Sequence, residues 1–322
     1  MNKFKNGFLG FLAAALILGL SPVSATAAQD NNEITVQQVE GNNEIAFVEP
    51  LDSISKSSND NPNDVNPNEI KEVQYLLSYN NATGVQSTRL LEPNETIETL
   101  DSVTPLAQGG VVYGVLLTPI DGAAEADISF RINGFVGSKP NRIDLTYTLF
   151  RGVQRGTTGT SVGGCTASIQ GILNVKEGKT VVCNKKISQT GYYFGKVDLN
   201  IKNALGVSMG TDSSQTRQIL TNKRATVYPH HYDPYSNKTM AEPARTDWAR
   251  TASVTWGKTE RGVYIKKYSE LYPSNGWNWD GAVTHIHHVR PREYGGTNAF
   301  DNLIPIPARV HESIVSPWFT GY

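Results

Sequence analysis

Four of the six histidines in this chain of 322 residues lie near its C-terminal end. His285, His287 and His288 stand within four positions, and His311 follows them. A neutral imidazole can bind a divalent metal ion or accept a proton at neutral pH, so this crowding indicates a metal-binding or catalytic site. A structural role is the alternative, but core histidines with satisfied hydrogen bonds rarely come as an adjacent pair.

The residues around the histidines predict a strand followed by a turn. Val283–Val289 has the character of a strand, and Pro291 ends it. The pair Gly295-Gly296 allows a positive-φ turn that sends the chain back. The first strand therefore carries the histidine pair close to its end.

A second strand and a helix are predicted after this turn. Residues 301–305 are typical of a short strand, and residues 308–315 suit a helix. Pro307 fits near the first turn of the helix, and Pro317 lies just past its expected end. The predicted order is strand, long turn, strand, helix.

This frame predicts different roles for the histidines. His287 and His311 approach each other across the hairpin, where two imidazoles on rigid elements can bind a divalent cation and leave positions open for water and phosphate. His288 points to the other side because strand side chains alternate, so it is free to act as a base.

The segment resembles the His-Asn-His (HNH) nuclease motif of the ββα-metal kind, found in colicin nucleases and in C-terminal toxin domains of secreted bacterial proteins. The likeness covers about 35 residues, with a core at 283–316, and rests on several elements in the same order and at similar separations. These elements are the pair His287-His288, Pro291, the Gly295-Gly296 turn, Asn302 before an apolar strand, and His311.

The resemblance implies a role for each matching residue. His287 and His311 match the metal ligands, and His288 matches the general base. Asn302 matches the asparagine that in these families positions the loop of the catalytic histidine or coordinates the metal. The implied activity is metal-dependent hydrolysis of phosphodiester bonds.

The chain departs from the family pattern at two positions. Colicin-type sites have a further histidine one helical turn after His311, where this chain has Val315. Related toxin domains often have an acidic residue two positions before the pair, where this chain has His285. The third ligand therefore stays open between His285, Asn298 and Asn302, and the metal between magnesium, manganese and zinc.

Arg290 and Arg292 follow the histidines and could bind neighbouring phosphates through their planar guanidinium groups, although ordinary surface charge explains them equally well. From Gln215 onward the chain has 13 Lys and Arg against 9 Asp and Glu, a balance of +4, whereas the earlier part has −5. This excess suits a nucleic-acid partner without establishing one.

These features predict a nuclease that acts on DNA with little sequence preference, because no element suited to reading bases is evident. RNA is an alternative polymer, and a non-catalytic secreted binding protein with a structural metal site is an alternative function. An antibacterial toxin is one expected use, and an immunity protein is then a candidate partner, because a producer needs protection if the enzyme folds before export.

The first residues predict export. Lys3 and Lys5 precede an apolar run, 8–20, and small residues follow it, which is the order of a signal peptide, 1–28. A membrane anchor is the alternative, but the run is shorter than the ~20 residues that span a bilayer. We therefore expect a secreted protein with no membrane span after the signal is removed.

The rest of the chain predicts a multidomain protein. Residues 29–105 are expected to be a polar, largely disordered spacer, because the stretch 56–69 is rich in Asn, Asp, Ser and Pro. Residues 106–222 alternate with period two and predict a β-sandwich-like domain. Residues 223–322 are expected to form the small α+β nuclease domain.

The remaining features concern stability. Cys165 and Cys183 are the only cysteines, and export favours a disulfide between them over two free thiols. All five tryptophans fall after residue 223, where a small aromatic core is favoured over base stacking. A second pair, His230-His231, lacks the surrounding motif and is expected in a loop.

Overall fold

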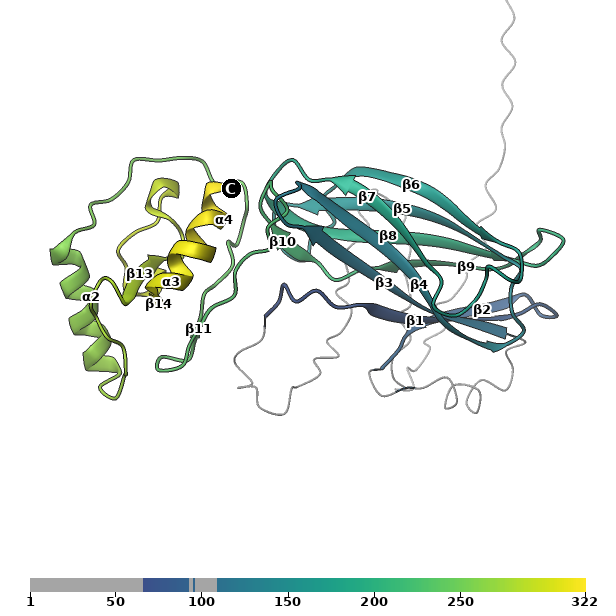
Figure 1. The fold of residues 1–322 in the computed structure, drawn as a ribbon, viewed down its shortest axis with the longest axis horizontal. Coiled ribbons are helices and arrows are strands. Elements are labelled where there is room, and N and C mark those ends of the chain that lie inside the picture. The colour runs from purple at the N-terminus through teal and green to yellow at the C-terminus, as the bar shows by residue number, and fades with distance from the viewer. Residues whose placement is uncertain (1–65, 93–94, 96–108) are drawn as a thin grey trace, which may run out of the picture. The chain divides into compact units, whose positions relative to one another are not determined.

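Alternating apolar residues give the middle of the chain its antiparallel strands. The computed structural model describes residues 66–92, 95 and 109–322 (Figure 1). The predicted signal peptide, 1–28, lies outside the described residues. Ile128, Phe130 and Ile132 are all fully buried, as their alternation with polar residues predicts.

The first antiparallel sheet has five strands. Its order is β2 (Val85–Leu90), β1 (Val73–Asn80), β3 (Gly109–Ile120), β4 (Glu125–Gly137) and β7 (Thr180–Lys186). This sheet corrects part of the spacer prediction, because β1 and β2 fall within residues 29–105. The strands form there because Tyr75, Leu77 and Tyr79 alternate and are buried in the core.

The second antiparallel sheet also has five strands. They are β10 (Ile219–Thr221), β8 (Gly191–Lys202), β5 (Arg142–Gly152), β6 (Thr160–Gln170) and β9 (Ser208–Gln215). β5 pairs with β6 and β8, and both β9 and β10 pair with β8. The expectation of an antiparallel β-rich region is therefore confirmed.

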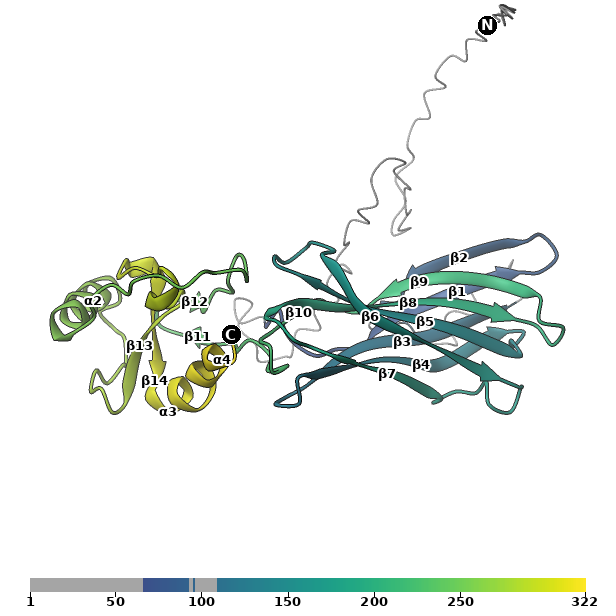
Figure 2. The same ribbon diagram turned by 90° about the horizontal axis from the view of Figure 1, so that it is seen from above.

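The two sheets share one hydrophobic core. Inward-facing residues of β1, β3 and β4 pack with those of β5 and β8, and Tyr147 of β5 donates a hydrogen bond to the carbonyl of Val181 in β7. Cys165 of β6 and Cys183 of β7 form the predicted disulfide. This bond joins the edge strands of the two sheets, as Figure 2 shows for β6 and β7.

The last hundred residues contain short strands and all the α-helices of the described residues. A two-stranded ribbon, β11 (Tyr232–Asp233) and β12 (Lys238–Thr239), precedes the helix α2 (Lys258–Leu271). The hairpin β13 (Thr284–His288) and β14 (Leu303–Pro307) follows. The predicted loop around His230-His231 is confirmed, since neither residue lies in a strand.

A helical segment completes the chain after the hairpin. Its parts are α3 (Ala308–Val310), a π-helical turn (His311–Val315) and α4 (Ser316–Thr320). The expected stop at Pro317 is wrong, since the proline lies in the first turn of α4. The π turn has already interrupted the i to i−4 bonding pattern there, and the first turn of a helix tolerates the missing N–H donor of proline.

The second strand starts later than the sequence predicted. Residues 300–302 form a 3₁₀ turn, and β14 begins at Leu303. The side chain of Asn302 causes this difference, because it bonds to the backbone of the preceding loop instead of extending a strand.

Aromatic side chains fill the core around α2 and the hairpin. Tyr264 and Tyr268 are buried with Leu303, and Trp277 and Trp279 pack against them. The buried carboxylate of Asp233 accepts hydrogen bonds from Tyr268, Ser236 and Trp277 and so anchors this cluster to β11. The expectation of an aromatic core is confirmed.

All described residues belong to one compact unit, 34–322, so the boundary at residues 222 and 223 stays a prediction. Within the described ranges, no helix has the length and apolar character needed to cross a membrane.

Candidate functional site

The hairpin β13–β14 separates the histidines onto two faces. In the antiparallel register His287 stands opposite Ile304, and His288 stands opposite Leu303. Because side chains alternate along a strand, His285 and His287 lie on one face and His288 on the other. Both members of the adjacent pair are buried, whereas His285 is partly exposed.

His311 contacts the two histidines on the first face. Its Nε2 atom lies 3.2 Å from Nδ1 of His287, and its Nδ1 atom lies 3.2 Å from Nδ1 of His285. The π-helical turn after β14 brings it there, and α3 lies beside the hairpin in both views (Figure 1, Figure 2). The structure thus brings together His287 and His311, which the sequence proposed as metal ligands, and adds His285 to them.

Burial keeps His287 neutral. Desolvation, followed by the nearby His311, lowers the pKa of His287 to about 3. Its ring packs beside Phe319, and its Nε2 atom is fully buried without a hydrogen-bond partner. A neutral imidazole is the form that binds metal ions, and burial lowers the pKa of His311 as well.

The facing ring nitrogens of His287 and His311 are of the type that binds a divalent cation. Nitrogen atoms 3.2 Å apart can belong to one N–H···N bond or direct two lone pairs at one ion, and the unpaired Nε2 of His287 shows that its ring is not held by other bonds. In the described part of the chain, no three His, Cys, Asp or Glu side chains are grouped so that they could hold one metal ion. The orientation of His311 accounts for the absence of a three-residue group, because its ring turns one nitrogen to His287 and the other to His285.

His288 lies in a different environment on the opposite face. Its Nε2 atom is 2.9 Å from Oδ1 of Asn298, and its ring meets the ring of Trp256 edge-on at 4.6 Å. The Nδ2 atom of Asn298 donates to the carbonyl of Thr255, which fixes the amide orientation. Oδ1 of Asn298 therefore faces His288, so Nε2 must be the protonated nitrogen and Nδ1 keeps its lone pair.

The free nitrogen of His288 is not sealed inside the protein. Nδ1 has no hydrogen-bond partner within the described ranges. It is not fully buried either, so it retains contact with solvent. Burial lowers the pKa of His288, and the bond to Asn298 raises it less. The ring is therefore unprotonated at neutral pH, as a general base must be.

Asn302 holds the loop between the two strands. Its Oδ1 accepts from the backbone N–H of Arg290, and its Nδ2 donates to the carbonyls of Arg290 and Thr297. Gly295 has a φ of +84°, and a side chain at Gly296 would collide with the carbonyl of Arg290.

Two residues offered as candidates for the third ligand are thus occupied elsewhere. Both polar atoms of Asn302 bind the loop backbone, so this residue positions the loop. Asn298 bonds to His288 on the face away from His287 and His311. Among the three candidates, only His285 lies beside His311.

Both arginines near the histidines also hold backbone. Arg290 is exposed, lies over the ring of Trp248, and donates through Nε to the carbonyl of Tyr294. Arg292 is partly buried and donates to the carbonyl of Val254. Each therefore has a local structural contact beside any role in binding phosphate.

Sequence reasoning missed the contacts that orient His288. Trp256 and Thr255 precede α2 and are separated from the motif by about 30 residues, so local spacing gave no signal for them. Trp248, Phe319 and Glu312 were also missed, because each contacts a residue far from it along the chain, Arg290, His287 and His285 respectively. A carboxylate oxygen of Glu312 lies 3.6 Å from Nε2 of His285.

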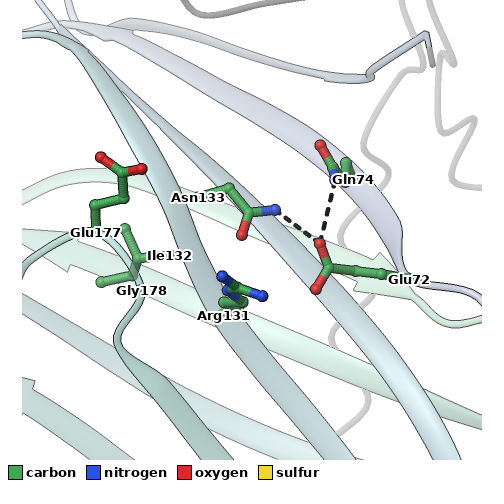
Figure 3. Close-up of a pocket in the computed structure, with 7 residues that line it drawn as sticks. All are labelled: Glu72, Gln74, Arg131, Ile132, Asn133, Glu177 and Gly178. Carbon is green, nitrogen blue, oxygen red and sulfur yellow. Dashed lines mark hydrogen bonds between the residues drawn. The ribbon is translucent and has the colours of Figure 1, made fainter.

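A depression lies elsewhere, on the first sheet. It has a volume of about 580 Å³ and is lined mainly by polar residues, among them Glu72, Arg131, Asn133 and Glu177 (Figure 3). Glu72 accepts hydrogen bonds from Asn133 and Gln74. No histidine lines it, so it is separate from the candidate site.

Comparison with known proteins gives no family for this chain. No family model matches the sequence, and no curated protein matches it.

Proposed function

We propose that the C-terminal part of this protein, 223–322, is an HNH endonuclease domain of the ββα-metal type. It hydrolyses phosphodiester bonds of DNA with little sequence preference, and it belongs to a secreted protein, exported by the signal peptide at residues 1–28, that acts as an antibacterial toxin. The β-sandwich-like domain, 106–222 together with β1 and β2, accompanies it. An immunity protein protects the producing cell.

One arrangement supports this proposal above all. The facing nitrogens of His287 and His311 lie on one side of the hairpin, and the adjacent His288 turns a free, solvent-accessible Nδ1 to the other side. Metal-assisted hydrolysis uses a bound metal ion and a general base, and the hairpin and its helix supply two candidate ligands and one candidate base. The resemblance of the motif leads to the same chemistry.

The residues of the chain have separate tasks. His288 accepts a proton from the attacking water at Nδ1, because Asn298 occupies its Nε2. His287 and His311 hold the divalent ion, magnesium, manganese or zinc, through the facing Nδ1 and Nε2 atoms. When bound, this ion neutralises charge on the phosphate and on the departing oxygen. Arg290 and Arg292 bind neighbouring phosphates through N–H groups that remain beside their backbone bonds.

Plasmid cleavage tests the proposal. The purified chain is incubated with plasmid DNA and each metal in turn, with and without chelator, beside His288→Ala and the control Lys266→Ala on the exposed face of α2. We expect wild type and control to cut only with metal, and His288→Ala to cut about 10²–10⁴-fold more slowly. Cleavage should also fall steeply with salt, because binding depends on phosphate contacts.

The alternatives give different results. Inert wild type with every metal, on both DNA and RNA, would support a non-catalytic binding protein with a structural metal site. Cleavage of RNA alone would change the polymer and keep the mechanism. Equal rates for wild type and His288→Ala would refute the assignment of the base.

A further inference from the structure

Three loops lie at one end of the two sheets. They are the β4–β5 loop (138–141), the β6–β7 loop (171–179) and the β8–β9 loop (203–207), named here the tip loops. The β6–β7 and β8–β9 loops carry unusually exposed aliphatic side chains. Leu205 is 88% exposed and Leu173 is 84% exposed, the highest fractions among the exposed large hydrophobic side chains of the described residues. Ile172 and Val207 are also more than half exposed, at 56% and 58%.

Hydrogen bonds hold the tip loops together. The N–H of Asn141 donates to the carbonyl of Lys202, and the N–H of Gly171 donates to the carbonyl of Asn141. Nζ of Lys139 donates to the carbonyl of Ile172. The end of β6 and the hairpin of β8 and β9 lie at the same end of the sheets (Figure 2), so the loops that carry the exposed aliphatic side chains share this end.

The tip loops are positively charged, unlike the rest of the first part of the chain. They contain Lys139, Lys176 and Lys179 against a single acidic residue, Glu177, which gives a balance of +2. The sequence before Gln215 has a balance of −5. Aliphatic side chains flanked by lysines suit a bilayer, in which anionic headgroups cover an apolar layer of acyl chains.

The backbone of the most exposed loop is already satisfied. Oδ1 of Asn203 accepts from the N–H groups of Leu205 and Val207, and the N–H of Asn203 donates to the carbonyl of Val207. A loop with internally bonded backbone groups can enter the lipid interface at lower cost, because no water or partner must satisfy them there.

We propose that the tip loops bind the surface of an anionic lipid bilayer. Leu173 and Leu205 insert at the boundary between headgroups and acyl chains, with Ile172 and Val207 beside them. Lys139 and Lys176 lie at the headgroups, where they attract anionic lipids. This inference does not depend on the nuclease proposal, since the tip loops are distant in sequence from the histidines and none of their residues belongs to the hairpin β13–β14.

Vesicle sedimentation tests this inference. The chain without the predicted signal peptide, residues 29–322, is mixed with phosphatidylcholine vesicles and with vesicles that also contain phosphatidylglycerol, at low and high salt. We expect binding to the anionic vesicles only, weakened by salt. The double variant Leu173→Asn with Leu205→Asn should bind about tenfold or more weakly, because it loses the apolar contact without a change of charge.

A matched control places the same changes on another surface. Val263→Asn with Leu271→Asn alters two exposed aliphatic side chains of α2, and it should bind vesicles as wild type does. An unchanged thermal midpoint shows that each variant is folded. Failure of wild type to bind anionic vesicles, or equal binding by the tip variant, overturns the proposal. A wild-type dimer that the tip variant converts to a monomer, without vesicle binding, overturns it in favour of contact between two copies.

Discussion

His287 and His311 face each other across the hairpin and helix, with Nδ1 of the first 3.2 Å from Nε2 of the second. Burial lowers the pKa of both rings, so both are neutral near pH 7. The other nitrogen of His311 is turned toward His285 and the hydroxyl of Ser316. The pair therefore resembles a binding site more than an ionic contact, since neither ring carries a charge.

Metal binding should stabilise the folded chain through this pair. A metal ion that binds only the folded state at 100 times its dissociation constant raises the free energy of unfolding by about 2.7 kcal/mol. We expect manganese or zinc to raise the thermal midpoint of wild type and to have little effect on His311→Ala. The measurement is thermal unfolding with a metal titration.

The control for this experiment is Ser313→Ala, which changes an exposed side chain in the same helical segment. It should respond to metal as wild type does. A full metal-induced shift in His311→Ala would show that the ion binds elsewhere.

The hairpin and its helix could be predicted because local residue types determine them. Pro291, the two glycines and the apolar residues of β14 each restrict the backbone over a few positions. The approach of His287 and His311 could be predicted from the strand, turn and helix that these residues define. The same holds for the strands β4, β5 and β8, where alternation matches burial. Short-range rules were sufficient wherever neighbours along the chain decide the conformation.

Long-range contacts account for what the sequence did not reveal. The strands β1 and β2 were hidden because a polar stretch precedes them, and they form by long-range pairing of β1 with β3 and of β2 with β1. The contacts that link His288 to Asn298 and Asn298 to Thr255 could not be predicted, because they depend on the path of loops that join segments distant in the sequence. Nothing in the residue pattern shows that His311 presents a different nitrogen to each partner, because ring orientation is decided by packing.

Asn298 should affect catalysis without affecting metal binding. It accepts from Nε2 of His288 and thereby fixes the tautomer whose Nδ1 lone pair accepts a proton. We expect Asn298→Ala to lower the cleavage rate about 10–100-fold, in line with the loss of a positioning partner. Asn298→Asp keeps an acceptor and should recover part of the rate. Plasmid cleavage and metal-dependent unfolding, measured on the same preparations, separate the two properties.

The control for Asn298 is Thr297→Ala, which keeps the backbone carbonyl that binds Asn302 and loses only the long bond from the N–H of Ala299 to the Thr297 hydroxyl. It should cut at the wild-type rate. If Asn298→Ala abolishes the metal-induced shift together with cleavage, Asn298 supports the whole site and has no separate effect on the base.

Acid should destabilise the protein through His287. Its pKa is about 3 in the folded state and ordinarily 6.5, so between these values the unfolded chain binds a proton that the folded chain does not. The free energy of unfolding therefore falls as the pH falls below 6.5 and is unaffected by this group above that value. The loss is about 1.4 kcal/mol per pH unit, or roughly 2 kcal/mol between pH 6.5 and pH 5.

Urea unfolding with chelator at several pH values measures this loss. His287→Asn removes the titrating ring, so its stability should decline less with acid than that of wild type. Carboxylates titrate equally in both proteins and cancel in the difference. Identical slopes for the two proteins would mean that His287 is not buried as a neutral ring.

The disulfide should stabilise the two-sheet region by restricting its unfolded state. Cys165 and Cys183 are separated by 18 residues, for which the chain-entropy relation gives about 3 kcal/mol. The double variant Cys165→Ser with Cys183→Ser should therefore unfold at a midpoint lowered by roughly 6–12 °C. Reductant should lower wild type to the same midpoint and leave the variant unchanged, since the variant has no bond to break. If reductant does not change the wild-type midpoint although mass measurement confirms two free thiols, the link between β6 and β7 contributes nothing to stability.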